Sequence, residues 1–164
     1  EKKYRFDVVG VTFDNDQGIN IQTVLKDLIR EYKKLGELES FDGMTNREII
    51  KEYVNEFGPE GMSEFEGQYI YNRVSLVPEP NNPYDKNAIK VYLSGRHIGY
   101  VARTENVQLA ELINTHNLVR NTAEFTGGRH KWVRYDNDYF IEESNVTIGV
   151  SVTLTFRSDE YVAS

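Results

Sequence analysis

The pattern of hydrophobic and polar positions predicts strands at both ends of the chain. The clearest strand lies near the end of the sequence, where every second residue is apolar: Val146, Ile148, Val150, Val152, Leu154 and Phe156. A period of two places these side chains on one face of a sheet. Residues 4–11 are rich in β-forming side chains and predict the first strand. Further strands are predicted at 69–77, 88–93, 97–101 and 118–125.

Three segments have helical periodicity. Residues 20–35 place apolar side chains at helical spacing behind Asn20 as N-cap, and Gly36 ends the pattern. A second helix is predicted from Asn46 to about Phe57, because Thr45 and Glu48 have the spacing of a capping box. A third helix is expected over 105–115, directly after the hairpin formed by 88–101. Both of the first two helices lie between the first and second predicted strands, so they form an insertion at about 18–67.

The remaining segments are predicted as connections. Residues 58–68 contain three glycines and indicate a loop, and residues 126–130 indicate a turn. Residues 131–142 are expected to form a strand pair with its tip at 136–138. Residues 157–164 are expected to be a tail. The prediction is therefore a single, mainly β domain over residues 1–164 with helices added to it.

Composition limits the function classes. The chain lacks an apolar run long enough for a membrane helix and a signal-peptide pattern, so we expect no membrane contact. It also has no cysteine, which favours a cytoplasmic location. The formal net charge is −7, but the charge is uneven: from Asp14 to Gly67 there are 13 acidic and 6 basic residues, and the remainder has 13 of each. The acidic excess therefore lies in the inserted segment.

Residues 78–87 form a polar loop with three prolines between two predicted strands. Each proline fixes its own φ and restricts the preceding residue, so the loop is expected to be stiff. It would hold Tyr84, Asp85, Lys86 and Asn87 in fixed directions, which suits a ligand with a planar ring and polar groups, such as a nucleotide or a peptide terminus. The alternative is that Asn82 and Asp85 only cap the turn while Tyr84 only covers the edge of the core.

The loop and hairpin also carry a family resemblance. Residues 82–91 (NPYDKNAIKV) and 95–101 (GRHIGYV), with 6–13 (FDVVGVTF) ahead of them, resemble the HIRAN domain. The resemblance is good over 4–13 and about 69–115, weak over 118–156 and absent over 14–68. It implies a small OB-like or SH3-like β-barrel. Together with the helical periodicity, this predicts a barrel with a two-helix insertion and one helix after the central hairpin. It also implies binding of single-stranded DNA at its 3′ end, to recruit or position DNA-processing machinery in repair or replication.

The resemblance assigns roles to individual positions. Tyr84 matches the residue that stacks on the terminal base, and Asp85 matches the acidic residue that meets the 3′-hydroxyl. Asn81 and Asn82 match the loop that frames the end of the strand. Tyr100 and Arg103 fall where the family has phosphate contacts, and Phe13 falls at the position of a second stacking aromatic. Lys86 adds a cation beside the stacking tyrosine, as single-strand binders require.

Two departures from the family pattern mean that the ligand could differ from single-stranded DNA. Thr12 stands where a DNA-binding member has an arginine, and Tyr100 stands where it has a histidine. Each change removes a source of positive charge near the phosphates. DNA binding would then be weak and salt-dependent, or the family fold would serve a new ligand.

The sequence contains no motif or residue set that indicates catalysis, a metal site or a cofactor. The three histidines, His97, His116 and His130, lack metal-ligand spacing and are expected on the surface or in turns. We therefore expect a binding protein and not an enzyme. The runner-up function is a protein-interaction module, in which residues 20–57 bind a partner or self-associate. For the helical pair itself, the simpler expectation is that both helices only cap the barrel and cover an edge or an open end.

Overall fold

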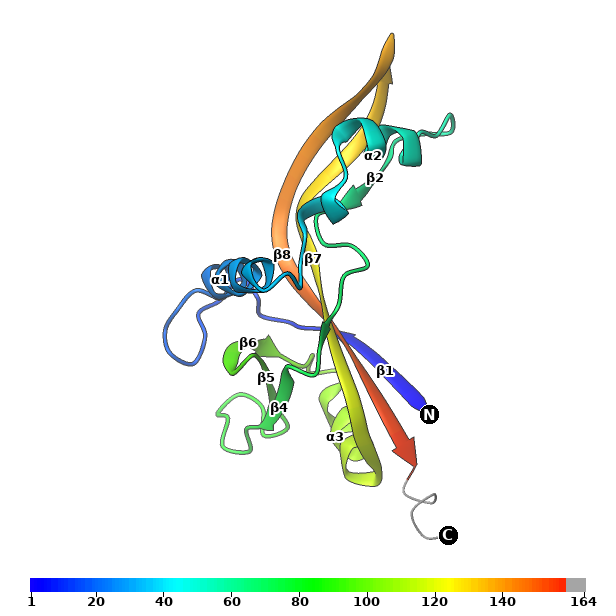
Figure 1. Cartoon of the computed structure of the whole chain (residues 1–164). Helices are drawn as coiled ribbons and strands as arrows, with labels where there is room; N and C mark the ends of the chain where they lie inside the picture. Colours follow the sequence, from blue (N-terminus) through cyan, green and yellow to red (C-terminus); the bar gives the residue numbers. More distant parts are fainter. Residues whose placement is uncertain (159–164) are drawn as a thin grey trace.

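The structure, a computed structural model, describes residues 1–158 and is mainly β with three α-helices (Figure 1). The strands are β1 Lys2–Asp7, β2 Glu60–Ser63, β3 Ile70–Tyr71, β4 Val74–Pro78, β5 Ile89–Leu93, β6 Arg96–Tyr100, β7 His116–Asp136 and β8 Asp138–Ser158. The helices are α1 Ile21–Lys34, α2 Asn46–Tyr53 and α3 Asn106–Thr115, with a short 3-10 helix, η1, at Ser40–Gly43.

The strands curl into a barrel-like arrangement. One antiparallel sheet has the order β1-β8-β7-β2, with β3 also paired to β7, and a second has the order β4-β5-β6. Val9, just after β1, exchanges both backbone hydrogen bonds with Tyr100 of β6, at 2.9 and 3.0 Å. On the other side, the backbone N–H of Val74 in β4 donates to the side chain of Asn121 in β7 at 2.9 Å. The two sheets therefore surround one core, which confirms the predicted OB-like, mainly β fold.

Gly99 permits the first of these junctions. Its φ is +145°, and a Cβ at this position would collide with the carbonyl oxygen of Val9. Only glycine combines this backbone conformation with so close an approach. The residue next to it, Tyr100, can then pair with Val9 and join β6 to the end of β1.

The β7–β8 hairpin continues far beyond the barrel (Figure 1). We call the part of the hairpin beyond Gly127 and Gly128, together with α2 and β2, the arm. The tip is Asn137, as predicted. The predicted turn at 126–130 is wrong, because Gly127 and Gly128 lie inside β7. Both have positive φ, and the pairing register with β8 shifts between them. The double glycine thus lies opposite a β-bulge, whose extra residue is Thr147 of β8, and it does not end β7.

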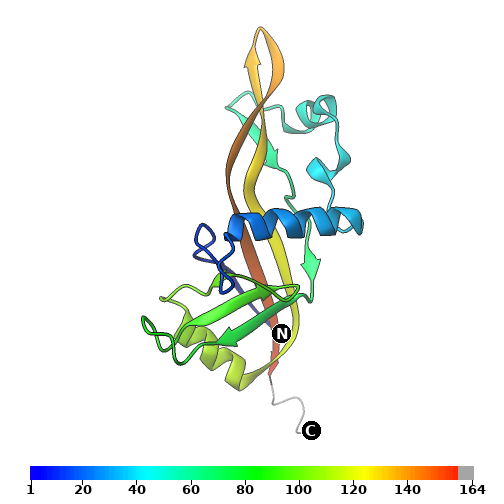
Figure 2. The same ribbon diagram turned by 90° about the vertical axis from the view of Figure 1, so that its left-hand side faces the viewer.

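The two inserted helices pack in different places. Asn20 caps α1 and Thr45–Glu48 form the capping box of α2, both as predicted. α1 buries Val24, Leu25 and Leu28 in the barrel core, and Figure 2 shows it crossing the hairpin where barrel and arm meet. α2 instead packs with β2 in a separate apolar cluster on the arm. The expectation that both helices cap the barrel therefore holds for α1 and is wrong for α2.

Several boundaries differ from the prediction. The loop expected at 58–68 contains β2, which pairs with β7. The strand expected at 69–77 is broken into β3 and β4 because Asn72 has φ +58°. α2 ends at Tyr53 and not near Phe57. Of the predicted tail, residues 157 and 158 belong to β8, and residues 159–164 lie outside the described part. None of the helices within residues 1–158 has the length and apolar character required to span a membrane.

Candidate nucleic-acid interface

The loop between β4 and β5, residues 79–88, is held by its own side chains. The Oδ1 atom of Asn82 accepts hydrogen bonds from the backbone N–H groups of Tyr84 at 2.8 Å and Asp85 at 3.0 Å. The side-chain amide of Asn82 donates to Glu79, and its backbone N–H donates to the Glu79 carbonyl at 3.0 Å. These bonds keep the β4–β5 loop in one conformation, and they show that Asn82 caps the turn.

Asp85 ties the β4–β5 loop to α3. One carboxylate oxygen accepts from the backbone N–H of Asn87 at 2.9 Å, and the other accepts from the side chain of Asn106 at 2.8 Å. Asn106 is the first residue of α3 and is buried. The Asn87 N–H, helped by Asn106 and by Arg103, lowers the pKa of Asp85 against a smaller opposing effect of burial. Asp85 therefore remains an ionised acceptor at neutral pH.

Tyr84 stands out from this rigid loop. Its side chain is 85% exposed, so it does not cover the edge of the core. Arg103 donates from Nη2 to the backbone carbonyl of Tyr84 at 2.8 Å, and its Nε lies 4.0 Å from a carboxylate oxygen of Asp85. Asn81 and Lys86, on the same loop, are exposed. The structure thus brings together an exposed aromatic ring, a carboxylate and two cations.

The two remaining predicted residues lie on other elements. Tyr100, at the end of β6, donates its hydroxyl to Glu79 at 3.2 Å, and burial raises the pKa of this tyrosine. It therefore contacts the base of the β4–β5 loop. Phe13 is exposed on the connection between β1 and α1. Its backbone hydrogen bonds are to Gly10 and Ile21, not to the β4–β5 loop.

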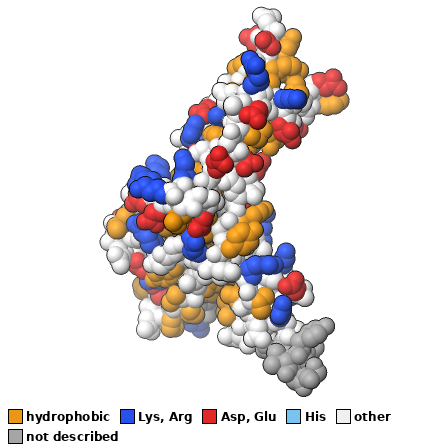
Figure 3. All heavy atoms as spheres, in the orientation of Figure 1, with side chains coloured by type: hydrophobic (Ala, Val, Ile, Leu, Met, Phe, Trp, Pro, Cys, Tyr) orange, Lys and Arg blue, Asp and Glu red, His pale blue; other side chains and the backbone are white. Residues whose placement is uncertain are grey.

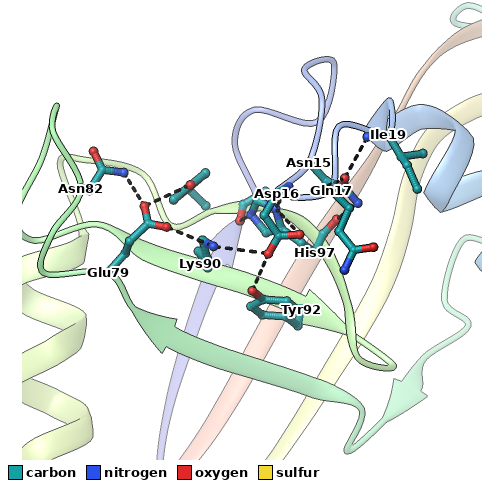
Figure 4. A network of polar contacts seen from close by, with 11 residues as sticks. Asn15, Asp16, Gln17, Ile19, Glu79, Asn82, Lys90, Tyr92 and His97 are labelled. Atoms are coloured by element: carbon teal, nitrogen blue, oxygen red, sulfur yellow. Dashed lines mark hydrogen bonds and ion pairs between the residues drawn. The ribbon is translucent and has the colours of Figure 1, made fainter.

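A polar network beside the loop was not predicted from the sequence (Figure 4). Lys90 of β5 lies 3.3 Å from Asp16 and 3.0 Å from Glu79, and Tyr92 donates its hydroxyl to Asp16 at 2.6 Å. Hydrogen bonds to both carboxylates raise the pKa of Lys90. Lys90 and Tyr92 share one face of a strand, but nothing local in the sequence pairs them with Asp16. The charge of Lys90 is neutralised inside the protein, so it is less suited to bind phosphate than Lys86 or Arg103.

His97 belongs to the same network, and its expected surface position is wrong. It is only 3% exposed, and its Nδ1 accepts from the backbone N–H of Asp16 at 2.9 Å. The Nε2 atom lies 3.0 Å from the Gly99 carbonyl. This arrangement assigns the proton to Nε2 in a neutral ring, and burial lowers the pKa of His97. His97 fixes the Asp16 loop against β6. Within residues 1–158, no group of three His, Asp or Glu side chains is placed to hold a metal ion.

Comparison with known proteins decides the family. The model of the HIRAN domain matches residues 60–155, which is more than half of the chain. This protein belongs to the HIRAN domain family. HIRAN is known as a DNA-binding domain. The match contains the β4–β5 loop and hairpin and extends through β7 and most of β8, whereas residues 4–13 lie outside it.

Solved structures and curated proteins add little detail to the HIRAN assignment. The crystal structure of the HIRAN domain of human HLTF is similar, with 18% identity and a TM-score of 0.35. The similarity covers 96% of this chain and 78% of that chain. No curated protein matches the chain. The roles of individual residues in this HIRAN domain therefore rest on its own geometry.

Proposed function

We propose that this HIRAN domain binds single-stranded DNA at the 3′-hydroxyl end, with the β4–β5 loop as the capture site. The observation that carries the proposal is the exposure of Tyr84 on a loop that is already rigid. A large aromatic ring in water is available for stacking, and base stacking contributes about 1–3 kcal/mol per base. A pre-ordered loop loses little conformational entropy when the strand binds.

Asp85 gives the site its preference for an unmodified end. Its carboxylate lies next to Tyr84 in sequence, and its lowered pKa keeps it charged. An ionised carboxylate accepts a hydrogen bond from a 3′-hydroxyl and repels a 3′-phosphate. Its two existing bonds, to Asn87 and Asn106, fix its orientation and leave further lone pairs on its oxygens.

Arg103 and Lys86 supply the positive charge for the backbone phosphates near the end. The site has only these two cations, because the charge of Lys90 is already paired with Asp16 and Glu79. In addition, Thr12 stands where a DNA-binding member of the family has an arginine. Affinity should therefore be modest and fall with added salt, by a slope of about −0.7 per neutralised phosphate. The domain acts by binding, without catalysis, to recruit or position DNA-processing machinery.

Fluorescence anisotropy tests this proposal with two labelled single strands that differ only at the 3′ end. The strand with a free hydroxyl should bind, and the strand with a 3′-phosphate should bind much more weakly. Tyr84→Ala should weaken binding of the first strand about fivefold or more. Tyr135→Ala, which removes an exposed tyrosine near the tip of the arm, is the matched control and should have no effect.

Equal binding of both strands would refute recognition of the 3′-hydroxyl. Unchanged binding by Tyr84→Ala would refute the β4–β5 loop as the site. Failure of both strands to bind at low salt would mean that this HIRAN domain has kept the fold and lost DNA binding.

A second candidate function is a protein contact through residues 20–57. It is favoured by Phe57, which is 90% exposed, and by the exposed Leu35 and Val54. Apolar side chains on an acidic segment suit a protein partner or a second copy better than DNA. Sedimentation analysis should then show self-association that Phe57→Ser abolishes and that added salt does not weaken. If the chain stays monomeric at all concentrations, self-association is refuted, and a contact through residues 20–57 would have to be with a different protein.

A further inference from the structure

The outer face of the β1-β8-β7 sheet carries a second set of aromatic and basic side chains. Directly opposed residues of antiparallel strands point to the same side of a sheet. Two neighbouring rows cross this face: Tyr71–Thr122–Thr153–Arg5, and Arg120–Thr155–Lys3. Leu154, which lies between the two rows on β8, is fully buried and faces the core, as are Ala123 and Val152 on the other side of the first row. The ends of the rows, Lys3, Arg5, Tyr71 and Arg120, are exposed on the outside of the barrel, while Thr155 between them is buried.

Two tyrosines stand at one end of this face. Tyr71 is 58% exposed and Tyr69, two residues earlier, is 45% exposed. Tyr71 belongs to the first row, and Tyr69 lies just before β3; both line a hollow with Lys3, Arg120 and the threonines. Figure 3 looks toward this region, where hydrophobic side chains lie beside Lys and Arg side chains over the lower part of the β1-β8-β7 sheet.

Two of the three cations on this face, Lys3 and Arg120, are available to an outside ligand. Within residues 1–158, neither Lys3 nor Arg120 has a carboxylate within 4.0 Å, whereas Arg5 lies 4.0 Å from Glu124. This contrasts with Lys90, which has two carboxylates at close range. The chain has a net charge of −7, but this face has unpaired cations beside exposed tyrosines. Such a surface is complementary to an anionic ligand with aromatic rings.

We propose that this surface, the tyrosine face (Lys3, Arg5, Tyr69, Tyr71 and Arg120), is a second site for single-stranded DNA that binds an internal stretch of the strand. Bases stack on the two tyrosines and phosphates contact Lys3 and Arg120, which is the combination used by sequence-tolerant single-strand binders. A duplex is a poor ligand, because its base faces are covered by its own stacking. The choice of DNA as the ligand rests on the proposed function, but the site does not depend on the β4–β5 loop.

The dimensions of the face suit an extended strand. From β3 to β1 there are three strand spacings, about 14 Å in all. The tyrosines lie at one side of this span and Lys3 at the other, with threonine side chains between them. None of the residues that line this hollow is acidic, so the site should not distinguish a 3′-hydroxyl from a phosphate. It contributes equally to both linear strands, and the difference between them reports the β4–β5 loop.

A circular single-stranded DNA separates the two sites, because it has no 3′ end. The full chain should bind the circle in a gel-shift titration at low salt. Tyr71→Ala should weaken this binding about fivefold or more. Arg120→Gln should reduce the slope of log affinity against log salt by about 0.7. Tyr84→Ala, together with the controls Tyr135→Ala and Arg47→Gln, should leave binding of the circle unchanged.

The result that overturns the tyrosine face is a circle that fails to bind, or one whose binding is unchanged by Tyr71→Ala and Arg120→Gln. If the linear strand with a free 3′-hydroxyl still binds in that case, the end-capture function stands and only the second site is lost. If the circle binds through Tyr71 while the linear strands show no preference for a 3′-hydroxyl, the tyrosine face stands and end capture is lost.

Discussion

The barrel and the arm differ in what holds them together. The barrel core joins buried side chains from seven strands, α1 and α3, including Leu93, Ile98 and Phe156. The arm core has four buried residues, Phe41, Ile49, Met62 and Val133. Beyond this small cluster, the hairpin carries exposed aromatic side chains such as Tyr135 and Phe140. The arm is therefore an extension with little apolar burial of its own.

The polar side chains differ in the same way. At the barrel, residues far apart in sequence meet in a network that fixes loops, with Asp16 bound to Lys90 and Tyr92, and Asp85 bound to Asn106. On the arm, the ion pairs of Arg129 and Arg134 are about half exposed, and solvent-exposed pairs contribute little to stability. Long-range polar contacts therefore fix loop geometry at the barrel, whereas the outer part of the arm is held mainly by the backbone pairing of β7 with β8.

The largest expected difference comes from matched core substitutions. Ile98 and Ile49 are both fully buried, one in each cluster. Ile98→Ala should lower the global free energy of unfolding by about 2–5 kcal/mol, because it leaves a cavity in the main core. Ile49→Ala should instead remove hydrogen-exchange protection from α2 and β2, while β5 and β6 keep theirs. Equal loss of protection in β5 and β6 would show that arm and barrel unfold as one unit.

A smaller effect is expected from replacing one carboxylate in each region. Asp85→Asn keeps a side-chain oxygen for the Asn87 N–H but removes the charge. Affinity for a 3′-hydroxyl strand should fall about tenfold, because hydrogen bonds to charged groups are the stronger ones. Discrimination against a 3′-phosphate should disappear as well. Asp138→Asn, at the tip of the arm, is the control. A variant Asp85→Asn that still rejects the 3′-phosphate would assign the discrimination to another group.

The smallest effect concerns the pH dependence of stability. Burial lowers the pKa of His97 below its ordinary 6.5, against the opposing effects of Asp16 and Glu79, and it also lowers the pKa of His130 on the arm. Each neutral ring therefore contributes stability that is complete above pH 6.5 and is lost as the pH falls toward the folded-state pKa.

Urea unfolding measured about one unit above and one unit below pH 6.5 gives this loss for each variant. His97→Gln should reduce the loss more than His130→Gln, because His97 is the more deeply buried ring. The opposite order would place the main pH-sensitive contact on the arm.

Local signals in the sequence are enough to predict the helix caps and the tip of the hairpin. Asn20 capping α1 and the Thr45–Glu48 capping box depend only on residues within one turn, and so does the hairpin tip at Asn137. The stiffness of the β4–β5 loop was also predictable, since Asn82 bonds to its neighbours Tyr84 and Asp85.

Features that depend on distant pairing were not predictable. Gly127 and Gly128 have the sequence of a turn, and only the pairing with β8 keeps them inside a long strand, opposite a bulge at Thr147. The bond between Asp16 and Tyr92 joins residues 76 positions apart. The same limitation applies to His97, whose burial results from the Asp16 loop covering it. For the tyrosine face, only the register of four strands brings Tyr71 and Lys3 to one surface.

Photo-crosslinking tests most directly whether the β4–β5 loop captures a 3′ end. A single strand with 5-iodouracil as its terminal base and a free 3′-hydroxyl is irradiated with the full chain, and the modified peptide is identified by mass spectrometry. We predict a crosslink at Tyr84 that disappears when the strand carries a 3′-phosphate. A terminal base that instead crosslinks to aromatic residues of the arm, such as Tyr135, with none at Tyr84, would contradict the account.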